Sequence, residues 1–282
     1  MSAIGNNNTP PVEKRYIFAG LLVSPVSYLR HLDNAPPSVI IDARQRLAYL
    51  PEILHLTFSD TTDPTYEQLP ETKEEEETYR IKLGEMRCIV TGTIDPDICR
   101  ILPIESMVSC FEKLRRSKSC FDALWPIFPD RAKKIKWEYK PEGNMLCLSP
   151  QLHRWWCKAY FGFKCSKILR GSTRERKILR LTLYWMPRRG FSGPQERDYI
   201  LRYMADTLGP LDGVAAYRKA TATTGDLIQS GDMFAIEVDA DLAPQMKKEL
   251  DYQWTLVRIA ALTRPPTTHG HVVVEDSADG KG

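Results

Sequence analysis

The residue types best suited to chemistry lie close together in the stretch NMLCLSPQLHRWWCKAYFGFKC. Ser149 followed by Pro150 is typical of a helix start, because a hydroxyl caps free N–H groups and proline fits the first turn. We therefore predict a helix that runs to about Tyr160. The four-residue spacing from His153 to Cys157 places both side chains on one face of that helix. Both residue types bind metal ions, so a cation site is the first possibility to weigh.

A metal site on this helix would need further ligands from other parts of the chain. Thiolate suits zinc and is a poor ligand for magnesium, but one histidine and one thiol are too few for a stable site. The other histidines are far away in the sequence, at positions 31, 55, 269 and 271, and none of the seven cysteines forms a CxxC pair. We expect buried free thiols, no bound metal and no other cofactor.

Aromatic residues are dense around the same stretch. Core packing explains any single tryptophan. As a set, they also suit a cleft for a small apolar molecule with a few polar groups in its wall. Both interpretations stay open, and for the second the predicted substrate-binding residues are Trp155, Trp156, Cys157, Tyr160 and Trp185.

The elements around this stretch indicate an α+β fold. RCIVTG from Arg87 and DICRILP from Asp97 predict two strands of a hairpin joined by TIDPD. KILRLTLYWMP alternates apolar and polar residues, as in a half-buried strand, and MFAIEV predicts another strand. QMKKELDYQWTLVRIAALT predicts a long helix. Further helices are predicted at 105–124 and 195–209.

The remaining segments frame these elements. Residues 16 to 58 fit strands and short helices in a flanking layer, with DARQRLAYLPEIL as one amphipathic helix. The polar, proline-broken segment 59–78 predicts a loop or a helix entry and marks an internal boundary. The predicted organisation is a leader at 1–15, a flanking layer at 16–84, a central domain at 85–190, a second flank at 191–263 and a tail at 264–282.

Composition narrows the class of protein. A chain of 282 residues that is 43% hydrophobic can bury a substantial core. It has no uncharged apolar run of about 18 residues and no secretory signal pattern at the N-terminus, so we expect a cytoplasmic protein with no membrane partner. Eleven Lys or Arg between Arg154 and Arg189 stand against Glu175 alone. Such a stretch is either a solvated face or a surface for a polyanion.

The order of strand, strand and helix resembles the HNH-nuclease domain, particularly its divergent branch in filamentous fungi. The resemblance rests on Cys88, Thr91 and Gly92, on Ile101 and Pro103, on Asn144, and on LSPQLHRWW with the KAYFG that follows. It implies a ββα unit embedded in flanking strands and helices. In that family a histidine takes a proton from water, an asparagine orients it, and helix residues hold one divalent cation.

Two positions depart from the family pattern. CRILP places Arg100 where relatives have the base histidine, and a guanidinium cannot accept a proton at neutral pH. LHRWWC places Cys157 where relatives have a helix carboxylate. We therefore expect a degenerate HNH-like unit that has lost nuclease activity.

The expected function is a metal-independent enzyme acting on a small apolar molecule, of the cyclase or pericyclase type, in fungal secondary metabolism. Arg100 or His153 would polarise a carbonyl, and Asn144 completes the predicted catalytic set. Two alternatives stay open. One is a divalent-metal-dependent HNH endonuclease with unusual ligands, and the other is a module that binds nucleic acid without cutting it.

Overall fold

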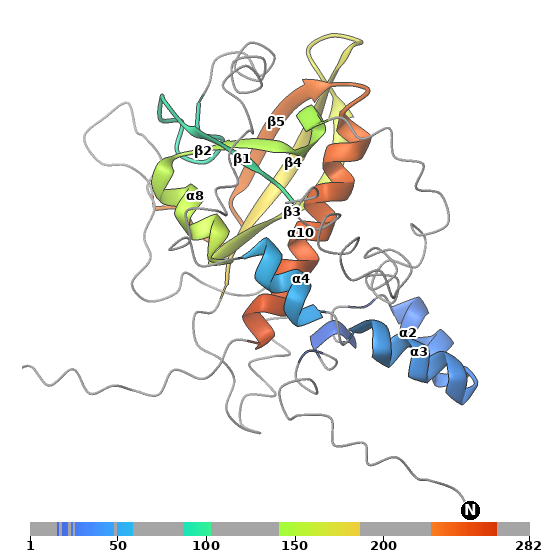
Figure 1. The fold of residues 1–282 in the computed structure, drawn as a ribbon. Coiled ribbons are helices and arrows are strands. Elements are labelled where there is room, and N and C mark those ends of the chain that lie inside the picture. Colours follow the sequence, from blue (N-terminus) through green and yellow to red (C-terminus); the bar gives the residue numbers. More distant parts are fainter. Residues whose placement is uncertain are drawn as a thin grey trace, which may run out of the picture.

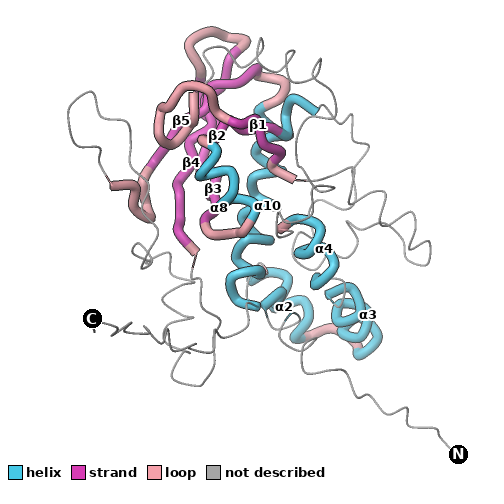
Figure 2. Tube along the Cα trace, turned by 60° about the vertical axis from the view of Figure 1, so that its left-hand side comes forward, coloured by secondary structure: helices cyan, strands magenta, loops and turns pink. Residues whose placement is uncertain are grey.

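The computed structural model describes residues 16, 19–21, 24, 26–47, 50–58, 87–102, 141–186 and 227–263 of the chain. Within these residues the fold is α+β, with helices packed around two antiparallel sheets (Figures 1 and 2). Its elements are α2 (Val26–Asp33), α3 (Pro37–Leu47), α4 (Leu50–Thr57), β1 (Asp97–Arg100), the 3-10 turn η3 (Pro141–Asn144), β2 (Met145–Leu148), α8 (Pro150–Cys157), β3 (Phe161–Arg170), β4 (Arg176–Trp185), β5 (Met233–Asp239) and α10 (Ala243–Thr263).

The strand that precedes α8 pairs with a segment more than forty residues earlier in the chain. β1 and β2 are antiparallel, with Asp97 opposite Leu148 and Arg100 opposite Met145. The predicted hairpin of RCIVTG and DICRILP is therefore wrong. Residues 88–91 form a turn, and only Arg87 makes an isolated bridge, to Ile94. The turn closes locally because the N–H of Gly92, at φ 71°, donates to the carbonyl of Cys88.

The second sheet has the order β3–β4–β5, all antiparallel. The strands predicted at KILRLTLYWMP and MFAIEV are confirmed as β4 and β5. Their alternation places Leu179, Leu181 and Leu183 in the core at full burial. β3 was not predicted, and it is the edge strand that joins α8 to the sheet. A register shift between Cys165 and Lys167 marks the point at which β3 leaves the core and becomes exposed.

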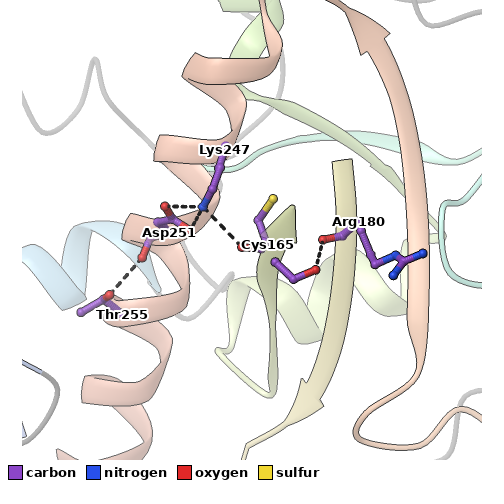
Figure 3. Close-up of polar contacts among 6 residues, drawn as sticks. Cys165, Arg180, Lys247, Asp251 and Thr255 are labelled. Atoms are coloured by element: carbon purple, nitrogen blue, oxygen red, sulfur yellow. Dashed lines mark hydrogen bonds and ion pairs between the residues drawn. The ribbon is translucent and has the colours of Figure 1, made fainter. Parts of the chain in front are cut away.

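The predicted long helix is confirmed as α10, which packs mainly on β3. Gly162 permits the approach, because a Cβ there would lie 2.5 Å from Cγ1 of Val257. Figure 3 shows the polar contacts that connect α10 with β3. Lys247 Nζ donates to the carbonyl of Cys165 at 3.4 Å and pairs with Asp251 at 2.9 Å. Thr255 Oγ1 continues the chain by donating to the Asp251 carbonyl.

The N-terminal part of the described chain is helical, so the strands expected within residues 16–58 are absent from the residues described there. α4 lies beside α10, whereas α2 and α3 lie farther from the strands (Figures 1 and 2). The predicted helix DARQRLAYLPEIL falls on the end of α3 and most of α4. Leu47, Leu50 and Ile53 join the same buried cluster as β4 and α10. No described helix has the length and apolar character needed to cross a membrane.

Several predicted features lie outside the described residues. They are the helices at 105–124 and 195–209, the polar segment 59–78, the leader 1–15 and the tail 264–282.

Candidate functional site

The helix that carries His153 begins as its sequence predicts. Ser149 Oγ accepts from the N–H of Leu152 at 3.5 Å, and Pro150 occupies the first turn. α8 ends at Cys157, earlier than the predicted Tyr160, because Ala159 adopts a φ of 51° that no helix continues. Eight residues give α8 little stability of its own, so contacts with β1, β2 and β3 must hold it.

His153 is paired with a carboxylate that the sequence reasoning missed. Its Nδ1 lies 3.0 Å from Oδ2 of Asp97, the first residue of β1. Because a carboxylate oxygen accepts, Nδ1 donates its proton to Asp97, and in the neutral imidazole this leaves the lone pair on Nε2. Nε2 is buried and has no hydrogen-bond partner in the part of the chain that the structure describes. The His153 side chain is 13% exposed and that of Asp97 is 38% exposed, so the pair lies near the surface.

Arg100 lies on the other face of β1. Alternation along the strand places Asp97 and Cys99 on the face toward α8, and Ile98 and Arg100 on the opposite face. Two separate buried clusters reflect this division, because Cys99 belongs to the main core whereas Ile98 packs with Met145 and Cys147. The Arg100 side chain is buried. The Arg100 side chain thus starts from the face of β1 opposite to Asp97, the residue that pairs with His153.

Asn144 holds the backbone after β1. It is fully buried, its Nδ2 donates to the Leu102 carbonyl at 2.7 Å, and its Oδ1 accepts from the Leu102 N–H at 2.9 Å. The Ile101 N–H also donates to the Asn144 carbonyl. These contacts stand at the Arg100 end of β1, whereas His153 is at the Asp97 end. Asn144 therefore clamps two chain segments, and the geometry does not make it the orienting partner of His153.

The aromatic residues divide into core and periphery. Trp156 and Trp185 are 2% and 1% exposed. Trp156 lies 5.5 Å from both Phe161 and Phe163, centroid to centroid, and Trp185 lies 5.5 Å from Phe161. The indoles of Trp156 and Trp185 therefore pack in the hydrophobic core. Of the predicted substrate-binding set, only Trp155 and Tyr160 are half-buried, and Cys157 is buried.

Two buried thiols, those of Cys157 and Cys99, lie near enough to the Asp97 carboxylate to be affected by its charge. Burial raises the pKa of Cys157 to about 11, and the nearby carboxylate of Asp97 adds to the effect. Burial also raises the pKa of Cys99 well above its usual value, with Cys157, Cys147 and Asp97 contributing. A thiol is a nucleophile only as thiolate. Neither of these two buried thiols is therefore activated as a nucleophile.

The donor set does not fit the divalent cation that the HNH resemblance implies. Asp97 and His153 offer one oxygen and one nitrogen, and the thiol of Cys157, one turn along α8 from His153, is a poor ligand for magnesium. Among the residues that the structure describes, no three His, Cys, Asp or Glu side chains are grouped so that they could hold a metal ion.

The cationic stretch falls mainly on the β3–β4 hairpin. Lys167, Arg170 and Arg180 are exposed there. Acidic residues of β5 offset part of this charge, because Asp239 pairs with Arg176 at 2.7 Å and Glu237 accepts from the N–H of Ser172. The surface is mixed in charge, as in an ordinary solvated sheet.

No family model, no curated protein and no solved structure matches this chain.

Proposed function

We propose that this protein is a metal-independent enzyme that uses His153 as a general acid and base on a small apolar molecule, in a cyclisation or a related rearrangement. The observation that carries the proposal is the hydrogen bond between His153 Nδ1 and Asp97, which leaves a buried Nε2 without a partner among the described residues. An imidazole held by a carboxylate is fixed in one tautomer and one orientation, and such a group transfers protons efficiently near neutral pH.

The pair supports a definite division of roles. His153 Nε2 takes a proton from a substrate C–H or O–H group and returns it to a developing anion. The Asp97 carboxylate stabilises the imidazolium that forms in between. The low exposure of the imidazole excludes most water, and this strengthens each electrostatic interaction in the site. None of these steps requires a cofactor.

We further propose that β1, β2 and α8 are a degenerate HNH-type ββα unit. The order of the elements and the position of His153 on the helix support this origin. The departure from the HNH pattern at Arg100 argues against phosphodiester cleavage. Arg100 cannot act as a base, and its side chain starts from the face of β1 opposite to Asp97. Binding of nucleic acid without cutting remains the weaker alternative, since β5 offsets part of the hairpin charge.

Proton abstraction from 5-nitrobenzisoxazole tests this function. This small apolar molecule loses one C–H proton to a base while its N–O bond breaks, which gives a coloured phenolate nitrile. We expect the full-length protein to accelerate the reaction and His153→Ala to lose the acceleration, since a positioned base contributes about a hundredfold to ten-thousandfold. Asp97→Asn should lose most of it. Chelators should not alter the rate.

The matched control is His55→Ala. His55 lies exposed on α4, so this variant removes an imidazole far from the candidate site. Equal rates for the protein, His153→Ala and His55→Ala would refute the proposal. Magnesium- or manganese-dependent nicking of supercoiled plasmid that disappears in His153→Ala would establish the nuclease alternative instead.

A further inference from the structure

His153 and Trp156 each make a polar contact between α8 and β1, and the contact of His153 is the candidate catalytic pair. His153 bonds Asp97 at the start of β1, and Trp156 Nε1 donates to the carbonyl of Arg100 at the end of β1, at 3.4 Å. The two contacts are three residues apart on both elements. A single contact would leave the short helix free to rotate about it, whereas two contacts fix both its position and its rotation.

The Trp156 ring is itself firmly placed by the larger sheet. It is 2% exposed and packs against Phe161 and Phe163 of β3. Those rings continue to Trp185 of β4 and to Phe234 of β5. The aromatic cluster therefore connects all three strands to α8, and the indole N–H of Trp156 links the cluster to the backbone of β1.

We infer that Trp156 is a positioning residue for His153. The ring of Trp156 is packed against the sheet, and its N–H bonds the backbone of β1, so together they fix the position of α8 along β1. This position keeps Nδ1 of His153 within hydrogen-bond distance of the Asp97 carboxylate. The role in catalysis rests on the function proposed above, but the effect on the His153 tautomer does not. A displacement of about 1 Å at a reacting group can lower a rate about a hundredfold, so such a tether matters for a proton-transfer site.

The test compares Trp156→Phe with Trp185→Phe in the full-length protein. Both indoles are almost fully buried in the same aromatic cluster, and both N–H groups donate to a backbone carbonyl, that of Arg100 and that of Ile228. Each variant thus removes one buried N–H···O bond and a similar volume. The two should lose similar stability, so a difference between them at His153 reports position and not general damage.

The readout is the nitrogen chemical shifts of His153 in protein labelled with ¹⁵N-histidine, which distinguish the Nδ1–H from the Nε2–H tautomer. His153→Gln assigns the signal. We expect the Nδ1–H form in the wild type and in Trp185→Phe, and a mixture of both forms in Trp156→Phe. The rate with 5-nitrobenzisoxazole should fall at least about tenfold in Trp156→Phe alone.

Two outcomes would overturn the inference: an unchanged tautomer in Trp156→Phe, or the same change in Trp185→Phe. If Trp156→Phe fails to fold, a tryptophan analogue with sulfur in place of the indole nitrogen keeps the ring size at position 156 and removes only the N–H, and the same comparison applies. A tautomer change without any catalysed reaction would refute the proposed function and leave the positioning role standing.

Discussion

The chemistry of the candidate site depends on one carboxylate. Asp97 supplies the acceptor that fixes the proton of His153 on Nδ1. Burial raises the pKa of Cys157 to about 11, and the same carboxylate adds to this effect. Asp97 therefore acts on two neighbours, because it accepts from His153 and opposes the ionisation of Cys157.

The buried thiols predict a loss of stability at alkaline pH. Burial raises the pKa of Cys157 and of Cys165 from 9.0 to about 11, with Asp97 adding to it at Cys157 and Asp251 at Cys165. Above pH 9 the unfolded chain releases these protons while the folded protein keeps them. The free energy of unfolding should therefore fall as pH rises from about 9 to about 11, where the folded thiols also ionise.

Urea denaturation at pH 8, 9, 10 and 11 measures this dependence. The variant Cys157→Ala/Cys165→Ala should start with lower stability and lose less of it over the same range, because only the wild type carries these two shifted thiols. Tyrosine ionisation affects both proteins equally. Parallel curves for the two proteins would contradict the assigned pKa values.

The sequence reveals His153 but not its partner, for a physical reason. Asp97 follows Pro96 in TIDPD, and such a segment has the composition of a turn. Its role appears only when β1 pairs with β2, because that pairing places the first residue of β1 beside α8. The one available signal was an acidic residue at the start of the apolar run that precedes Arg100. Spacing along the chain could not connect it to a histidine 56 residues away.

At the scale of elements, the sequence predicted correctly those features that depend on interactions within one segment of the chain. The cap at Ser149, the alternation along β4 and the apolar periodicity of α10 are each contained in one segment, and all three predictions are confirmed. Strand pairing is not contained in one segment. β1 pairs across a long connection with β2, where the sequence favoured the nearer partner joined by a short turn. β3 was missed because its outer half has little apolar alternation.

The contact between α10 and β3 predicts a strong coupling at Gly162. Gly162→Ala should destabilise the protein by about 1–3 kcal/mol, because the new methyl group would overlap Cγ1 of Val257. In a Val257→Ala background the same substitution should cost at least about 1 kcal/mol less, since the overlapping atom is gone. Urea denaturation of the two single variants and the double variant gives the coupling energy.

Gly143→Ala is the matched control for that cycle. A Cβ at Gly143 would lie 3.0 Å from the side-chain amide of Gln245, against 2.5 Å from Val257 at Gly162, so its cost should be below that of Gly162→Ala. Strictly additive effects of Gly162→Ala and Val257→Ala would mean that the helix and strand do not meet as described.

At the scale of the molecule, one buried cluster connects the N-terminal helices with the candidate site. It runs from Leu47 and Leu50, through Leu256 of α10, to Phe163 of β3 and Trp156 of α8. The sequence predicted the long helix and the α+β class, and it assigned residues 16–84 to a flanking layer. The polar segment after Phe58 divides the chain in sequence, whereas α4 and α10 meet in space.

Leu50→Ala tests whether this cluster unfolds as one unit. Leu50 is fully buried on α4, so its truncation should lower the free energy of unfolding by about 2–5 kcal/mol. Tryptophan fluorescence should shift to lower urea together with far-UV circular dichroism, although the described tryptophans lie on α8, β4 and α10. Ile41→Ala on α3 is the control, because Ile41 is 55% exposed and its truncation should change stability by less than about 0.5 kcal/mol. A fluorescence midpoint that stays in place while the dichroism shifts would show that the N-terminal helices fold apart from the core that holds His153.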